Sequence, residues 1–430
     1  MKYQKLSPQL YIANRSRLAA AINHGGIAVF TSNDIYPTSA DGTMPFKQAS
    51  DIFYLTGVDQ EETILVIFPS AAQAAHQEIL FVKETSEHIA IWEGAKLTKE
   101  QARAQTGILN IQWTHDFDKT MRLLMNEAST LYLNDNAHTR ATIEVETREM
   151  RLSKKLRSEY PHHSVARIAP EMHHLRAVKQ PEEIAQLKNA IDITQAGFER
   201  VLQFVKPGVL EYEIEAEFAH EFLRRGSRGF AYTPIIASGA NACVLHYIAN
   251  DQPCKDGDVI LLDVGAEYGN YNADMTRCIP VNGRFSARQK DVYNAVLRVM
   301  KSATQLLRPG TMIGDYHRAV GELMTKELVD LQLITMEEVK NANPAWPAYK
   351  KYFMHGTSHF LGLDVHDVGD WNIPMQVGNV FTVEPGIYIP SEGLGIRIEN
   401  NVVIEESETR NLFIEFPIEV EEIEDWMNRS

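Results

Sequence analysis

Residues 261–277, LLDVGAEYGNYNADMTR, contain an apolar run that ends in Asp263. A turn rich in Gly and Asn then leads back to a second acid, Asp274. A turn centred on residues 268–269 would make a two-residue hairpin that pairs these acids directly on one face. Like charges placed opposite one another are destabilising, so a cation, a proton or solvent must offset them.

The same arrangement recurs in residues 381–400, FTVEPGIYIPSEGLGIRIEN. A turn centred on residues 391–392 would pair Glu384 with Glu399. In a single hairpin, the simpler interpretation is that each acid lies at a strand end and points to water. Two hairpins, each with acids inside an apolar run, favour a functional explanation.

A weak internal repeat links these two regions. Segment 256–265 is DGDVILLDVG and segment 377–386 is VGNVFTVEPG, and in each a Gly is followed six residues later by a carboxylate. Two related halves would place equivalent acids at a shared centre. Matches this short also arise by chance, so the repeat alone does not establish a duplication.

Three histidines follow one another in residues 355–369, HGTSHFLGLDVHDVG. The segment is not a zincin motif, because Gly356 stands where H-E-x-x-H requires Glu. A single histidine is usually a hydrogen-bonded structural residue, but a cluster beside two acid pairs indicates at least one metal ligand. Four carboxylates and one imidazole suit Mn²⁺, Co²⁺ or Fe²⁺, with Zn²⁺ as a further candidate. Two such ions would balance four carboxylates and could lower the pKa of a shared water.

The first part of the chain has the pattern of a layered α/β domain. Helical periodicity is present at 7–22 and 98–105, and β-rich runs fall at 26–30, 52–58, 62–68, 77–82 and 130–134. Residues 161–174 lack periodicity, and Pro181 then begins a long amphipathic helix that continues to about Val205. We therefore expect domains at 1–174 and 175–430.

Composition excludes several classes of protein. Of 430 residues, 44% are hydrophobic and 23% charged, as in ordinary globular proteins. The net charge of −15 argues against binding to nucleic acid or to an anionic membrane. Three cysteines make no disulfide framework, and no apolar run approaches the ~18–20 residues of a membrane helix. We expect a cytoplasmic protein without a signal peptide.

The ordered set of acids and histidine in these motifs resembles the metal ligands of the pita-bread metallopeptidases: Asp263, Asp274, His359, Glu384 and Glu399. The histidine segment is most similar to the aminopeptidase P branch. PFKQASDIFYLTG, residues 45–57, resembles the N-terminal domain of that branch. The resemblance implies an α/β (α+β) chain, in which a pita-bread domain with a pseudo-twofold internal repeat follows the N-terminal domain.

The resemblance also implies roles for single residues. Asp263 and Glu399 would bridge two metal ions, usually manganese, with Asp274 on one ion and His359 and Glu384 on the other. Glu384 would also transfer protons. His246 and His366 resemble catalytic histidines that bind substrate and stabilise the tetrahedral intermediate. His355 resembles a histidine that lines the proline pocket, and Arg397 is a further substrate-binding candidate. Arg397 could instead orient a ligand carboxylate or be a surface residue of its strand. Tyr388 could donate a hydrogen bond behind the site or pack in the core. Trp92 could either approach a neighbouring subunit or pack within its own domain.

The implied activity is that of a dinuclear Xaa-Pro aminopeptidase, which removes the residue before proline from peptide substrates. The resemblance also implies a homo-oligomer, a dimer or a tetramer. The nearest alternative is an Xaa-Pro dipeptidase with the same fold and metals. A metal-free pita-bread binding protein is disfavoured because such proteins lose ligands, whereas all five are present here.

Overall fold

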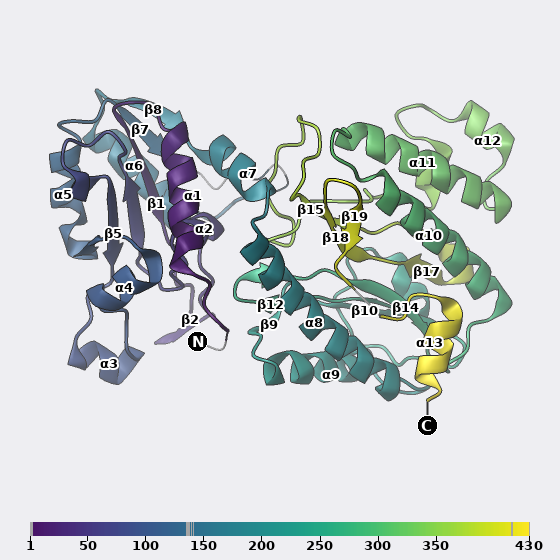
Figure 1. Ribbon diagram of the computed structural model, residues 1–430. Helices are drawn as coiled ribbons and strands as arrows, with labels where there is room; N and C mark the ends of the chain where they lie inside the picture. The colour runs from purple at the N-terminus through teal and green to yellow at the C-terminus, as the bar shows by residue number, and fades with distance from the viewer. Residues whose placement is uncertain (1–2, 135–137, 139, 141, 414–415, 430) are drawn as a thin grey trace. The chain divides into compact units, whose positions relative to one another are not determined.

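The computed structural model describes residues 3–134, 138, 140, 142–413 and 416–429. Figure 1 shows the course of the chain. By contacts it divides into two compact units. One comprises Lys5–Arg176, and the other comprises the chain from Ala177 onward together with Tyr3 and Gln4.

The first unit is built on a mixed sheet of six strands in the order β6-β5-β4-β1-β7-β8. Pairs β1–β7, β7–β8 and β5–β6 are parallel, whereas β4 is antiparallel to both its neighbours. The strands are β1 (Gly26–Thr31), β4 (Ile64–Ile67), β5 (Glu78–Val82), β6 (Asn110–Trp113), β7 (Thr130–Leu133) and β8 (Ser164–Arg167). A small hairpin joins β2 (Pro37–Ser39) to β3 (Gly42–Thr43).

The helices of this unit are α1 (Pro8–Ala21), α2 (Ser50–Thr56), α3 (Glu87–Glu93), α4 (Lys99–Thr106), α5 (Phe117–Leu124), α6 (Arg148–Glu159) and α7 (Ala169–Ala177). Helix α7 ends just past Arg176, the last residue of the unit. Short 3₁₀ turns are η1 (Ala74–His76) and η2 (Thr114–Asp116). Ser7 caps α1 by accepting from the Gln9 amide, as expected from the Ser-Pro start.

The strand predicted at 52–58 is wrong, because this segment forms helix α2. All seven residues of the helix are buried, so every position is apolar or inward-facing and no helical period is visible in the sequence. Gly57 ends the helix in the left-handed conformation (φ 66°), and a Cβ there would approach the Tyr11 ring within 2.2 Å. The aperiodic segment 161–174 likewise contains β8 and most of α7.

The second unit contains two helix pairs and several small antiparallel sheets. The long helix starting at Pro181 is α8 (Pro181–Phe204), which packs on α9 (Glu211–Arg224). Its counterpart is the pair α10 (Ala287–Leu306) and α11 (Ile313–Asp330). The remaining helical segments are η3 (Gly239–Cys243), α12 (Met336–Asn341), η4 (Ala348–Lys351), η5 (Pro390–Glu392) and α13 (Val420–Met427).

Its sheets have the orders β10-β11-β14, β13-β12-β9, β15-β18-β19 and β16-β17. The strands are β9 (Gly229–Phe230), β10 (Ile235–Ser238), β11 (Val259–Asp263), β12 (Ala266–Tyr268), β13 (Tyr271–Asn272), β14 (Thr276–Pro280), β15 (Val380–Val383), β16 (Gly386–Ile389), β17 (Leu394–Arg397), β18 (Asn400–Ile404) and β19 (Thr409–Asn411). No described helix is long and apolar enough to span a bilayer.

Corresponding strands of the two halves present the site acids. Asp263 ends β11, and Glu384 directly follows β15. The glycines six residues before these acids share one backbone conformation, with φ 85° at Gly257 and 88° at Gly378. The equivalence that the sequence repeat suggested therefore extends to the backbone.

The register of the first hairpin differs from the prediction. Asp263 pairs with Thr276, and Tyr268 pairs with Tyr271, so the turn is Gly269-Asn270. Both turn residues have positive φ, 58° and 69°, which Gly and Asn tolerate and Tyr does not. Asp274 is consequently two residues from the partner of Asp263, on the same face but not directly opposite.

The register of the second hairpin is the predicted one. Ile387 pairs with Ile396, and the same register holds for Val383 and Asn400. Glu384 and Glu399 lie between these pairs, so the two carboxylates face each other across the strands as expected.

Candidate metal centre

Asp274, His359 and Glu399 form the cluster best arranged to hold a cation. One ligand atom from each lies within 4.8 Å of the others, and all three residues are buried. Their backbones are fixed from several sides. Asn401 clamps Asp274 with two hydrogen bonds, from the Asp274 amide (3.1 Å) and to its carbonyl (2.6 Å).

Asp263 is tied to this cluster through Tyr232, which lies between β9 and β10. The Tyr232 hydroxyl is 2.5 Å from Asp263 Oδ1 and 2.6 Å from Asp274 Oδ1. A phenol has one proton and can donate to only one of the two carboxylates at a time. The bridge therefore holds the pair together without neutralising it.

Glu384 is tied to the cluster through His359. The His359 Nε2 atom is 3.5 Å from both Asp274 Oδ2 and Glu384 Oε1. The other ring nitrogen, Nδ1, is 2.9 Å from the Phe360 carbonyl, an acceptor that fixes Nδ1 as the donor. Nε2 is thus the nitrogen directed at the acids and available to a metal ion.

The electrostatics of these groups favour the binding of a cation. Burial, followed by mutual repulsion, raises the pKa of Glu399 well above its ordinary value. Burial likewise raises the pKa of Asp263, and that of Glu384 to about 7. Burial opposes a charged His359, but the Asp274 hydrogen bond and the nearby carboxylates raise its pKa overall. A divalent cation would offset the repulsion that opposes ionisation of these carboxyl groups. Carboxylate oxygens together with one imidazole also suit such a cation as ligands.

Arg397 connects the acids to Tyr388 and His355. Its guanidinium donates to Asp263 Oδ2 (2.5 Å), the Thr276 hydroxyl (3.2 Å) and the Tyr388 hydroxyl (2.8 Å), and the side chain is buried. These contacts favour orientation of Asp263 over direct contact with substrate. Thr276 in turn donates to Glu399 Oε2 at 2.6 Å, so the two hairpins are cross-linked.

The same contacts determine which ring nitrogen of His355 carries the proton. Because Tyr388 accepts from Arg397, its one proton is directed at His355 Nε2, 2.8 Å away. Nδ1 then donates to the Gly356 carbonyl at 2.8 Å. Burial and the Arg397 charge lower the pKa of His355 to about 3, so the ring is neutral. Phe353 packs edge-on against it, with ring centroids 4.9 Å apart.

The two remaining histidines reach the site from exposed loops. The His366 ring packs edge-on against His359, with centroids 4.4 Å apart. His246 is close enough to contribute to the lowered pKa of His355. All the candidates from residues 246 to 399 are thus gathered in the second unit, whereas Trp92 belongs to the first.

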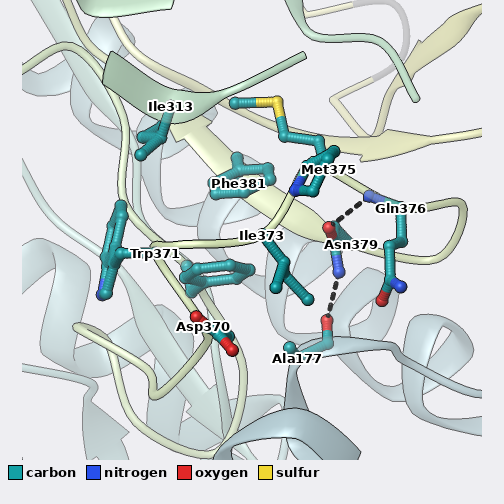
Figure 2. Close-up of a pocket in the computed structure, with 11 residues that line it drawn as sticks. Ala177, Ile313, Asp370, Trp371, Ile373, Met375, Gln376, Asn379 and Phe381 are labelled. Atoms are coloured by element: carbon teal, nitrogen blue, oxygen red, sulfur yellow. Dashed lines mark hydrogen bonds between the residues drawn. The ribbon is translucent and has the colours of Figure 1, made fainter. Parts of the chain in front are cut away.

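A neighbouring crevice is not the substrate pocket. It lies beside Phe360 and Phe381, and Asn379 fixes its wall by accepting from the Gln376 amide (2.7 Å) and donating to the Ala177 carbonyl (3.0 Å), as Figure 2 shows. Its volume of about 10 Å³ admits no more than roughly one water molecule.

Sequence reasoning missed Tyr232, Thr276 and Asn401. Thr276 lies within the first quoted motif and Asn401 directly follows the second, and the correct hairpin register would have placed Thr276 opposite Asp263. Tyr232 stands in AYTP, which carries no recognisable pattern, and only the packing of β9 and β10 against β11 and β12 brings it to the acids.

Comparison with known proteins agrees with this geometry. Residues 185–406 match metallopeptidase family M24. The chain belongs to metallopeptidase family M24. This M24 region contains every ligand candidate, and residues 11–132 match the aminopeptidase P N-terminal domain. The resemblance to the pita-bread metallopeptidases and the two-part α/β fold are confirmed.

Relatives of this M24 protein match over nearly all of its length. It is 34% identical to the Xaa-Pro aminopeptidase of Escherichia coli (strain K12), with 98% of each chain covered. It is 32% identical to Xaa-Pro aminopeptidase 3 of Rattus norvegicus, covering 99% of this chain and 87% of the relative. The solved aminopeptidase P from E. coli with the inhibitor Pro-Leu has a TM-score of 0.87 at 34% identity, with 99% of each chain covered.

Proposed function

We propose that this M24 metallopeptidase is an Xaa-Pro aminopeptidase, which releases the N-terminal residue from peptides with proline in second position. The observation that carries the proposal is the buried group of Asp274, His359 and Glu399, flanked by Asp263 and Glu384, in a chain similar end to end to Xaa-Pro aminopeptidases. An Xaa-Pro dipeptidase, the alternative considered from the sequence, is not favoured, because the relatives reported above, which match over nearly the full length of the chain, are Xaa-Pro aminopeptidases.

We propose two divalent ions, manganese first and cobalt, iron or zinc as substitutes. Asp263 and Glu399 would bridge them, Asp274 would complete one shell, and His359 and Glu384 would complete the other. When bound, such ions would polarise the scissile carbonyl and lower the pKa of the attacking water. The hydroxyls of Tyr232 and Thr276 would keep the carboxylates oriented, as groups behind metal ligands commonly do.

Glu384 is the proposed proton carrier. Its side chain is 20% exposed, whereas that of Asp274 is 8% exposed, so of the two it is the more open to substrate. It would accept a proton from the attacking water and deliver one to the proline nitrogen as the peptide bond breaks. The exposed rings of His246 and His366 would donate hydrogen bonds to the substrate and to the developing oxyanion.

His355 is proposed to line the proline pocket as a neutral ring. Its Nε2 accepts from Tyr388 and its Nδ1 donates to Gly356, so both nitrogens are already engaged. The ring can therefore offer substrate its flat apolar surface beside Phe353. Arg397 is assigned to positioning Asp263 and Tyr388.

The test compares Ala-Pro, Ala-Pro-Ala and Ala-Ala-Ala as substrates with added manganese. We expect the highest kcat/KM for Ala-Pro-Ala, with release of alanine only. The dipeptide forgoes binding energy beyond proline that could be used at the reacting centre, and Ala-Ala-Ala underfills the pocket. If Ala-Pro is the best substrate and Ala-Pro-Ala is not cleaved, the protein is a dipeptidase.

We further propose that the protein works in the cytoplasm as a homo-oligomer. All three cysteines are free, which suits a reducing compartment. Helix α3 exposes two large apolar side chains, Ile91 (77%) and Trp92 (78%), which a second copy could cover. Sedimentation analysis of the wild type and Trp92→Ser tests the oligomer, and a wild-type monomer at micromolar concentration would contradict it.

A further inference from the structure

His246 lies on an irregular loop that joins β10 to β11. After the 3₁₀ turn η3, residues 244–252 form neither helix nor strand, and His246 is exposed. A ring on such a loop would ordinarily sample many positions. A hydrogen-bonding role at a reacting carbonyl requires a fixed one, because a displacement of about 1 Å can cost on the order of 100-fold in rate.

A buried carboxylate from another element holds both ends of this loop. Glu211, the first residue of α9, has 0% of its surface exposed. Its Oε1 accepts from the Ser238 amide (2.8 Å), the Ser238 hydroxyl (2.7 Å) and the Asn241 side chain (3.2 Å), all at the start of the loop. Its Oε2 accepts from the Tyr247 hydroxyl (2.7 Å) and the Gln252 amide (3.0 Å), near the end.

These contacts make Glu211 a staple across the loop. Its own amide also donates to the Gln252 carbonyl at 3.0 Å, so the backbone is clamped in both directions. The two carboxylate oxygens serve different ends of the loop, and His246 lies between those ends. One residue after His246, Tyr247 makes the contact that is nearest in sequence to the ring.

The chemistry of the staple requires a carboxylate. All five donors to its oxygens are neutral groups, and burial of a charge is costly unless it is fully hydrogen-bonded. A glutamine could accept through one atom but would present an NH₂ group to the Gln252 amide, so one end of the loop would be released. Retention of a buried charge here is explained if it fixes a unique loop conformation.

We propose that Glu211 is a positioning residue for His246, which sets the histidine against the substrate by fixing both ends of its loop. The proposal rests on the proposed function of His246. Asn250 supplies a separate anchor, with hydrogen bonds to the Pro234 carbonyl (3.0 Å), the Glu215 carboxylate (2.9 Å) and the Ile236 amide (3.1 Å). The loop should therefore loosen rather than unfold when Glu211 is changed.

Hydrogen exchange tests the staple without using the activity. In Glu211→Gln, amides of residues 239–252 should exchange faster than in the wild type, while those of α10 keep their protection. Glu213→Gln is the matched control, because it removes a charge from the same helical turn but its carboxylate caps only the Leu210 amide. Unchanged protection of 239–252 in Glu211→Gln would overturn the proposal, even if the protein proved not to be an aminopeptidase.

A double-mutant cycle tests the action through His246. On Ala-Pro-Ala, Glu211→Gln should lower kcat/KM by about 10- to 100-fold, with unchanged metal content. In a His246→Ala background the same change should cost little, because the positioned ring is already absent. An equal loss in both backgrounds would show a merely structural role. Should Glu211→Gln fold poorly, Tyr247→Phe removes one donor and should give a smaller loss with the same dependence on His246.

Discussion

The Asp263–Asp274 pair and the Glu384–Glu399 pair occupy two hairpins of one domain, but their surroundings differ. Asp263 is bonded to the Arg397 guanidinium and shares the Tyr232 hydroxyl with Asp274. Glu399 accepts from the Thr276 hydroxyl, and Glu384 has a longer contact of 3.4 Å with the Thr382 hydroxyl. His359 contacts one acid of each pair. Beyond that shared contact, protein groups compensate the first pair better than the second.

The difference shows in protonation. The pKa of Glu399 lies well above its ordinary value because burial and three neighbouring carboxylates oppose its charge. The Arg397 charge and the Tyr232 hydrogen bond oppose the rise at Asp263. We infer that the aspartate pair is held in place by the protein, whereas the glutamate pair depends more on bound cations. The following predictions test that division.

The largest effect is expected for Glu384→Gln. The substitution keeps the shape but removes the charge and the proton acceptor, and a positioned proton-transfer group contributes ~10²–10⁴-fold to the rate. We expect kcat on Ala-Pro-Ala to fall by at least that range at saturating manganese. Glu392→Gln is the control, because Glu392 lies in the turn of the same hairpin and pairs with Arg288 at the surface. Near-wild-type turnover of Glu384→Gln would remove this residue from the mechanism.

Metal removal should destabilise the fold. A ligand that binds only the folded state adds RT ln(1 + [L]/Kd), about 2.7 kcal/mol at 100-fold excess over Kd. We expect chelation to lower Tm reversibly, with recovery on addition of manganese. Calorimetry of both forms measures the change, and superimposable melting curves after verified metal removal would contradict a shared cation site.

Tyr232→Phe should weaken metal binding without abolishing it. Loss of a group that orients metal ligands typically costs 10–100-fold in affinity or activity, and Arg397 still holds Asp263. A metal titration monitored by calorimetry measures the effect. Tyr293→Phe serves as control, since it also removes a tyrosine hydroxyl from the second unit, one that donates to the Ile418 carbonyl. Equal metal affinity in both variants would show that the Tyr232 bridge is dispensable.

The smallest effect concerns the pH dependence of the metal-free protein. A carboxyl whose pKa is raised on folding binds more protons in the folded state, so stability falls as pH rises above the unfolded value. For Glu384 the window runs from 4.5 to about 7, and the raised pKa of His359 acts in the same direction. Denaturant unfolding of the chelated protein should show this decline, and saturating metal should reduce it. Stability that rises across this window would refute the assigned shifts.

The register of the second hairpin could be predicted from the sequence, whereas that of the first was predicted wrongly. The difference lies in the residues of the two turns. The second hairpin turn begins with Pro390 and ends with Gly393, and these two residues restrict its placement. In the first hairpin, Tyr268-Gly269 and Gly269-Asn270 both place a glycine in the turn. Only the turn Gly269-Asn270 places at positive φ two residues that tolerate this conformation. Applying that criterion to the sequence would have selected this turn.

Other features depend on tertiary contacts that no local pattern records. Helix α2 is buried on all sides, so its apolar run could not be distinguished from a strand. Tyr232 and Glu211 form hydrogen bonds with residues far along the chain. Neither residue stands in a sequence motif that would mark it. Four of the five metal-ligand candidates were accessible from the sequence because carboxylates inside apolar hairpins are costly and therefore conspicuous. The choice of His359 among three histidines came from the family resemblance.

The late position of Glu399 has a consequence for biosynthesis. The first unit has its own buried core, from Ile27 to Leu156, and can begin to fold while the rest is being made. The cation cluster cannot form until Glu399 and Asn401 have left the ribosome and β18 has paired with β15. A nascent or prematurely terminated chain that stops before this point lacks one member of the cluster, so we expect it to show no metal-dependent activity.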